Sequence, residues 1–186
     1  RSNTNPTLAN KVALPVVVQD VERVWSARTT SGWTAVGVRF KKGANCTGVL
    51  IEVTDQELDD LDKREANYDR HPILLENIDQ VPFLPEAEFY EDDHPVFEAK
   101  EYDQDDNVKV WIYVQLDPVL ADPSHPIPQS YIDIIVRGCL KINKDFARSF
   151  IDTTSGWKHD DGHWVDDRDL PIYILADSEY SNQYGA

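Results

Sequence analysis

Apolar residues in the first half of the chain come in short runs rich in β-branched side chains, which is typical of strands. The first run covers residues 14–25, and few polar residues interrupt it, so we expect a strand that is buried on both faces. Turn residues at 31–32 precede a second run at 33–40, and turn residues at 42–44 precede a third at 46–53. The pattern therefore predicts antiparallel hairpins formed by successive runs.

Helical signals follow in two places. Thr54 with Glu57 matches a capping box, in which each side chain would bond the backbone amide of the other residue. Ser130 with Asp133 gives a similar N-terminal signal before a segment whose apolar residues follow helical spacing. The predicted helices span residues 55–66, 131–141 and 144–152.

The remaining segments complete a coarse prediction of the fold. We expect a short strand at 73–75, a hairpin from 96–102 and 108–116, and an irregular connector at 117–128, which holds four prolines. Strands precede helices and no βαβ alternation is visible, so the class is α+β with a mostly antiparallel, barrel-like sheet and a few flanking helices. One domain is expected over 1–177, followed by a frayed tail at 178–186.

Composition narrows the possible partners. The net charge of -16 and pI near 4.5 would repel a phosphate backbone, so we expect no nucleic-acid binding. An acidic surface suits solubility, or docking on a basic protein surface. No run of about 18 apolar residues exists, so we expect a soluble or peripheral protein that does not span a membrane. Cys46 and Cys139 are expected to be buried thiols and not a disulfide.

The N-terminus does not look like a translation start, because residue 1 is Arg and the chain contains no Met. A removed targeting segment would place the protein inside an organelle, and otherwise a cytoplasmic location is expected. The same observation also fits a chain that is part of a longer sequence.

Glu65 is the candidate for chemistry. At 3.6 residues per turn, Leu58, Leu61 and Glu65 point in nearly the same direction, so Glu65 would share the face that the leucines bury. Burial raises the pKa of a carboxyl toward neutrality, which suits a general acid/base. The structural alternative is a glutamate at the helix end that turns to solvent or pairs with Arg64 or Arg70.

Several motifs then resemble the γ-glutamylcyclotransferase family. The run Gly-Val-Leu-Ile-Glu-Val at 48–53, followed by Leu-Asp-Lys-Arg-Glu at 61–65, is similar to the family's strand and the helix that carries its glutamate. Trp-Ser-Ala-Arg at 25–28 is similar to an early family motif, and Ser-Tyr at 130–131 to the opening of a late helix. Segments within 153–173 are similar to the C-terminal part of a bacterial and plant subgroup.

The resemblance implies a reaction and its residues. Glu65 would take a proton from the α-amino group of a γ-glutamyl substrate, so that the amine attacks its own γ-carbonyl and forms 5-oxoproline. Tyr131 matches a family tyrosine that lines the substrate pocket, and Tyr68 lies close by in sequence. The structural alternative for Tyr131 is packing beside a helix start. The sequence does not indicate whether the substrate would be a γ-glutamyl dipeptide, glutathione or a γ-glutamyl amine.

Two departures from the family pattern shape the functional hypotheses. Ala66 stands where the family has Gly after the glutamate, and the chain contains no Tyr-Gly-Ser loop, whose backbone amides hold the substrate carboxylate in the family. The first hypothesis is therefore a catalytically impaired, cyclotransferase-like domain that acts as an accessory or structural subunit of a larger protein complex. The alternative is an active cyclotransferase.

No metal or cofactor is expected. His159, Asp160, Asp161 and His163 include residue types that bind metals, but they lie in a loop-like segment with no matching second cluster. A polar surface loop accounts for them. Asp166, Asp167 and Arg168 are expected to pair structurally.

Overall fold

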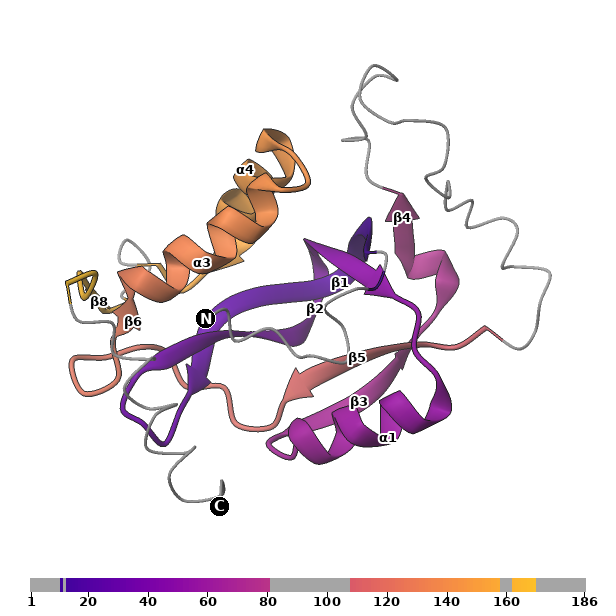
Figure 1. The fold of residues 1–186 in the computed structure, drawn as a ribbon, viewed down its shortest axis with the longest axis horizontal. Helices are drawn as coiled ribbons and strands as arrows, with labels where there is room; N and C mark the ends of the chain where they lie inside the picture. Colours follow the sequence, from indigo (N-terminus) through magenta and orange to yellow (C-terminus); the bar gives the residue numbers. More distant parts are fainter. Residues whose placement is uncertain (1–10, 12, 81–107, 158–161, 170–186) are drawn as a thin grey trace.

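A computed structural model describes residues 11, 13–80, 108–157 and 162–169, and these form an α+β fold. In Figure 1, α3 and α4 lie together on one side of the long β1–β2 ribbon, and α1 with β3 lies on the other. The elements in chain order are β1 (Ala13–Arg28), β2 (Thr34–Ile51), α1 (Asp55–Arg64), β3 (Tyr68–Ile73), a 3-10 turn η1 (Leu75–Asn77), β4 (Ile78–Gln80), β5 (Val110–Gln115), β6 (Ile127–Pro128), α3 (Gln129–Leu140), α4 (Lys144–Thr153), β7 (Thr154–Ser155) and β8 (Trp164–Val165).

The β1–β2 hairpin is the framework of the molecule. β1 is buried without a break from Val21 to Ala27, which confirms the prediction of a strand covered on both faces for this half. In residues 14–20 only Val16 and Val18 are buried, so that half is covered on one face. The hairpin around Ser31 and Gly32 is confirmed, and Gly32 has the positive φ of 82° that such a turn favours. The predicted second hairpin is wrong, because residues 33–40 and 46–53 do not pair with each other.

β2 instead continues through residues 41–44 without reversing direction, and the segments before and after them both pair with β1. The register shifts where Asp20, with φ of 59°, lies opposite Gly43, with φ of 79°. The Gly43 amide donates to Asp20 Oδ1 at 2.7 Å, which holds the extra residues as a bulge. Glycine and polar residues therefore signal a bulge at this position and not a chain reversal.

Most of the strand pairing is antiparallel, as predicted, but the sheets are separate and do not close into a barrel within the described residues. β1 pairs antiparallel with β2 and β4, whereas the short β7 pairs with it in parallel. β3 and β5 form a separate antiparallel pair, and β6 pairs in parallel with β8. The strand predicted at 73–75 is misplaced, because β3 ends at Ile73 and Leu75 begins η1. Residues 96–102 lie outside the described residues.

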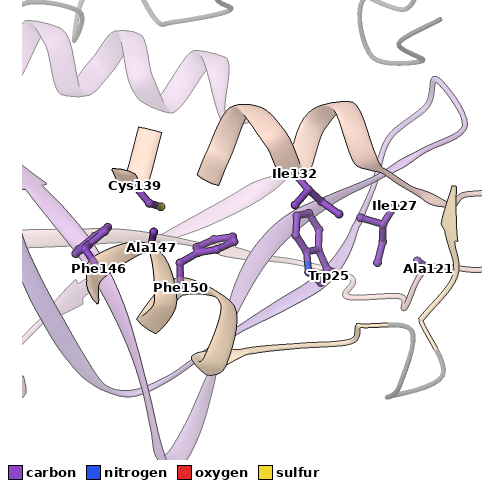
Figure 2. Close-up of a cluster of buried hydrophobic side chains, with 8 residues drawn as sticks. All are labelled: Trp25, Ala121, Ile127, Ile132, Cys139, Phe146, Ala147 and Phe150. Atoms are coloured by element: carbon purple, nitrogen blue, oxygen red, sulfur yellow. The ribbon is translucent and has the colours of Figure 1, made fainter. Parts of the chain in front are cut away.

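Two buried clusters hold these elements together. One lies between β1 and the helices α3 and α4, where Trp25, Ile132 and Phe150 pack with their neighbours (Figure 2). The other joins β1, β2 and β4 to the β3–β5 pair through Val16, Val21 and their neighbours. Cys139 belongs to the first cluster and Cys46 to the second, and both are buried free thiols, as predicted. Burial raises the pKa of each thiol.

The three predicted helices are present, with shifted ends. The capping box of α1 is confirmed, since the Glu57 amide donates to Thr54 Oγ1 and the Thr54 amide donates to Glu57 Oε2. α1 ends at Arg64 and not at residue 66. None of the described helices has the length and apolar character needed to cross a membrane.

The predicted cap of α3 is wrong. The helix begins at Gln129, and Pro128 occupies the N-cap, so Ser130 lies in the first turn. The orphan donors there are satisfied by Asp167, which accepts the Ser130 amide at 2.9 Å and the Ser130 hydroxyl at 2.6 Å. A carboxylate distant in sequence therefore fixes the helix end that carries Tyr131.

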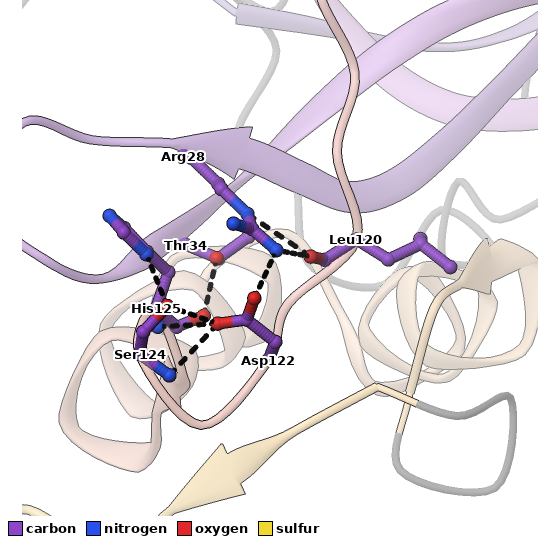
Figure 3. Close-up of polar contacts among 6 residues, drawn as sticks. All are labelled: Arg28, Thr34, Leu120, Asp122, Ser124 and His125. Carbon is purple, nitrogen blue, oxygen red and sulfur yellow. Dashed lines mark hydrogen bonds and ion pairs between the residues drawn. The ribbon is translucent and has the colours of Figure 1, made fainter.

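The connector before α3 is irregular, as its prolines predict, and it is fixed by Asp122 (Figure 3). Asp122 accepts hydrogen bonds from the Ser124 hydroxyl and from the backbone amides of Ser124 and His125. Arg28 pairs with the same carboxylate at 2.6 Å and also donates to the Leu120 carbonyl. This network ties the connector to the end of β1 and so positions the start of α3.

We expect this network to make stability depend on pH. The Ser124 hydroxyl, followed by the His125 amide and Arg28, holds the pKa of Asp122 well below its usual range. A depressed folded-state pKa means that the stabilisation is complete above the unfolded-state pKa, near 4, and is lost as the pH falls further. The melting temperature of Asp122→Asn should be below that of the wild type at pH 6, and the gap should narrow below about pH 4.

The control is Asp117→Asn, because Asp117 is an exposed carboxyl in the same connector. Its melting temperature should follow the wild type throughout the titration. A gap for Asp122→Asn that persists unchanged at low pH would contradict the network.

Candidate functional site

The C-terminus of α1 places Glu65 at the rim of the fold. Glu65 is the C-cap residue, its amide donates to the Leu61 carbonyl at 2.8 Å, and its own carbonyl accepts from the Tyr68 amide at 2.9 Å. The turn therefore places Tyr68 directly after the helix, at the first position of β3.

Glu65 is less buried than the helical pattern predicts. No residue of α1 is buried, and the Glu65 side chain is 27% exposed. The reason is that α1 lies at the edge of the molecule, beside the two-stranded β3–β5 pair (Figure 1). Arg64 Nε lies 3.5 Å from Glu65 Oε1, which is one of the contacts expected from a purely structural glutamate.

The charge of Glu65 acts on both of the predicted site tyrosines. Burial raises the pKa of Tyr68, and the negative charge of Glu65 raises it further. Burial raises the pKa of Tyr131 to about 12, with further contributions from Tyr68 and Glu65.

Tyr131 also has a packing role. Its ring lies 4.9 Å from that of Trp33 and 6.2 Å from that of Trp25, centroid to centroid. Both contacts agree with the structural alternative for this residue.

Three further residues, Asp62, Arg70 and Tyr113, adjoin the site, and the sequence motifs do not select them. The Tyr113 hydroxyl donates to Asp62 Oδ1 at 2.7 Å, and Arg70 Nη1 lies 3.3 Å from Asp62 Oδ2. Burial, the bond to Asp62 and the charges of Asp62 and Glu65 raise the pKa of Tyr113 well above its usual range. The charge of Glu65 therefore also reaches this group.

Sequence spacing could have indicated Asp62 and Arg70, but not Tyr113. Asp62 precedes Glu65 by three positions, so both lie on one face of α1. Arg70 follows Tyr68 by two positions, so both lie on one face of β3. Tyr113 is directly opposite Arg70 in the β3–β5 register, which no local pattern reveals.

Together these groups suit the recognition of an amine. A half-buried carboxylate beside phenol rings can accept hydrogen bonds from an ammonium group, and aromatic faces attract cations. The same carboxylate can accept a proton once the amine reacts.

Other clusters of reactive residue types have structural roles. The described residues contain no group of three metal ligands, and residues 159–161 lie outside them. Asp166 pairs with Arg168, as expected. Ser124 and His125 adjoin Asp122, but the Ser124 hydroxyl contacts the carboxylate and the imidazole nitrogen, so the imidazole does not stand between them as a nucleophilic triad requires.

Comparisons with protein-family models, curated proteins and solved structures returned no match. The resemblance to the γ-glutamylcyclotransferase family therefore rests on the sequence motifs alone.

Proposed function

We propose that this chain provides a γ-glutamylcyclotransferase-type site, in which Glu65 is the general acid/base and Tyr68 and Tyr131 contact the substrate. The observation that carries the proposal is the turn at the end of α1, where the Glu65 carbonyl accepts from the Tyr68 amide at 2.9 Å. The charge of Glu65 also raises the pKa of Tyr68 and of Tyr131, which lies on α3. The motif resemblance independently selects the same glutamate.

The proposed reaction needs no cofactor. The α-amino nitrogen of the γ-glutamyl residue attacks the γ-carbonyl carbon, and Glu65 accepts the proton that the nitrogen loses. The bond between the γ-carbon and the leaving nitrogen then breaks, and Glu65 returns the proton to that nitrogen. The products are 5-oxoproline and a free amino acid or amine, so atoms and charges balance without water.

The decisive substitution is Glu65→Gln, which keeps the shape of the side chain but cannot carry the proton. Release of 5-oxoproline from γ-glutamyl-alanine should fall by at least about a hundredfold, since a positioned general acid/base typically contributes 10² to 10⁴. The assay is chromatographic detection of 5-oxoproline, with circular dichroism to verify the fold.

Glu52→Gln is the matched control, because Glu52 is an exposed glutamate just before α1. It should retain wild-type turnover. Equal turnover in wild type and Glu65→Gln would remove Glu65 from its proposed role.

A second candidate is the accessory subunit without catalytic activity. The observation that favours it is the state of Glu65, which is 27% exposed and already paired with Arg64. Such a subunit would use its acidic surface to dock on a basic protein partner. A folded wild-type protein that releases no 5-oxoproline from any γ-glutamyl compound, but co-purifies in a salt-sensitive complex, would favour this candidate.

A further inference from the structure

Arg70 is a cation beside the site with unused hydrogen-bonding capacity. A guanidinium carries five N–H donors, yet Arg70 makes no side-chain hydrogen bond to any described residue. Among the described residues its ionic contact is with Asp62, at 3.3 Å, and its side chain is 29% exposed. Nη1 is buried and faces Asp62, so the donors that a ligand can reach are those of Nε and Nη2.

The orientation of Arg70 is fixed without those donors. Its guanidinium lies over the Trp111 ring, with the Cζ atom 4.6 Å from the ring centroid. A guanidinium stacked on an aromatic face presents its N–H groups at the edge of its plane, which is the geometry that a carboxylate accepts. Asp62 holds the same group from the side of α1.

The position of Arg70 relates it to the other site residues. It is on the same face of β3 as Tyr68 and opposite Tyr113, whose hydroxyl bonds to Asp62 on the face of α1 that carries Glu65. Glu65, which can accept hydrogen bonds from an ammonium group, thus lies at the end of α1. Arg70, which can donate to a carboxylate, lies on the neighbouring strand β3.

We propose that Arg70 binds the carboxylate of the amino acid that is released, so that the site prefers γ-glutamyl amino acids and peptides to γ-glutamyl amines. This inference rests on the proposed function and selects a substrate class that the motifs leave open.

The spacing favours this carboxylate over that of the glutamyl residue. In the glutamyl residue, the α-amino and α-carboxylate groups share one carbon, so a carboxylate held there would lie beside the amine that Glu65 contacts. The carboxylate of the released amino acid lies across the scissile bond. Two residues along a strand span about 6–7 Å, which places Arg70 beyond Tyr68 by a distance that suits the more remote group.

The test compares two substrates that differ by this carboxylate alone, γ-glutamyl-alanine and γ-glutamyl-ethylamide. The wild type should prefer γ-glutamyl-alanine in kcat/KM. Arg70→Gln should lower kcat/KM for γ-glutamyl-alanine by about tenfold or more, mainly through KM, because a charge-assisted hydrogen bond is lost. Turnover of the ethylamide should change by less than about twofold.

Control variants separate recognition from folding. Arg70→Lys keeps the charge and should retain part of the preference. Arg137→Gln removes an exposed arginine on α3 and should leave both substrates unaffected. Melting temperatures of all variants establish that the fold is intact.

An equal loss on both substrates would overturn the inference, because Arg70 would then act through Asp62 or on the glutamyl carboxylate. No loss on either would also overturn it. Calorimetric binding of both compounds to Glu65→Gln, and to the same protein with Arg70→Gln added, separates this inference from the proposed reaction. If the wild type releases no 5-oxoproline, the inference still stands on an Arg70-dependent binding preference, and falls if neither compound binds.

Discussion

Trp25→Ala is expected to lower the free energy of unfolding by about 3–5 kcal/mol, the usual cost of truncating a large buried aromatic side chain. Trp25 is fully buried at the centre of the cluster between β1 and the two long helices. Its ring makes edge contacts with Tyr131, Phe150 and Trp157, at centroid distances of 6.2, 6.4 and 5.1 Å. Removal would leave a cavity where three elements meet.

Urea denaturation followed by far-ultraviolet circular dichroism measures this loss, since the signal does not depend on tryptophan fluorescence. Trp164→Ala is the matched control, because Trp164 is 37% exposed and its indole donates one hydrogen bond to Gln129. That variant should lose about 1 kcal/mol, the usual net value of one hydrogen bond. Similar losses in the two variants would contradict the central role of Trp25.

Local signals in the sequence predict local structure well. Thr54 and Glu57 act within one turn of chain, and the capping box forms as expected. Ser31 and Gly32 reverse the chain between two runs that pair with each other, and that hairpin also forms. In both cases the residues that decide the structure are neighbours in sequence.

The predictions fail where a residue distant in sequence determines the local structure. The turn-like residues at 42–44 join a bulge because Asp20, on the neighbouring strand, binds the Gly43 amide. Ser130 does not cap its helix because Asp167 binds the first turn instead. Neither partner is visible from the local pattern, since each depends on how the chain returns to the same place.

The candidate site divides in the same way. Glu65 and Tyr68 belong to one helix end and the strand after it, so motif and spacing are sufficient to select them. The position of Tyr131 near them depends on packing against Trp33 and Trp25. Arg70 and Tyr113 are associated by strand register, which a single sequence does not specify.

Arg23→Met is expected to lower the free energy of unfolding by about 2–4 kcal/mol, because the buried oxygen atoms around the guanidinium would lose a charged hydrogen-bond donor. Arg23 is 8% exposed, and no acidic residue among the described ones pairs with it. Its guanidinium donates to the backbone carbonyls of Thr47 and Phe150 and lies 4.2 Å from the centre of the Phe150 ring. Three threonine hydroxyls, from Thr47, Thr153 and Thr154, accept its other N–H groups.

This arrangement connects β1, β2 and the end of α4 through a single side chain. Burial lowers the pKa of Arg23, which shows that the interior opposes its charge. The hydrogen bonds must therefore offset a desolvation cost, and methionine would remove that cost together with the bonds. The expected loss of stability is the free energy of the hydrogen bonds minus the desolvation cost of the charge. If stability falls in Arg23→Met, the oxygens around the guanidinium compensate for the absence of a carboxylate partner.

Arg23→Lys separates charge from geometry, since lysine keeps the charge but has three donors and no planar fork. It should lose about half as much stability as Arg23→Met, because part of the hydrogen bonding survives. Arg148→Met on α4 is the matched control, as Arg148 is exposed, and it should change stability by less than about 0.5 kcal/mol. Urea denaturation of all three variants decides: if Arg23→Met is as stable as the wild type, or more so, the buried arginine is a net cost to the fold, as it can be for ion pairs in protein interiors.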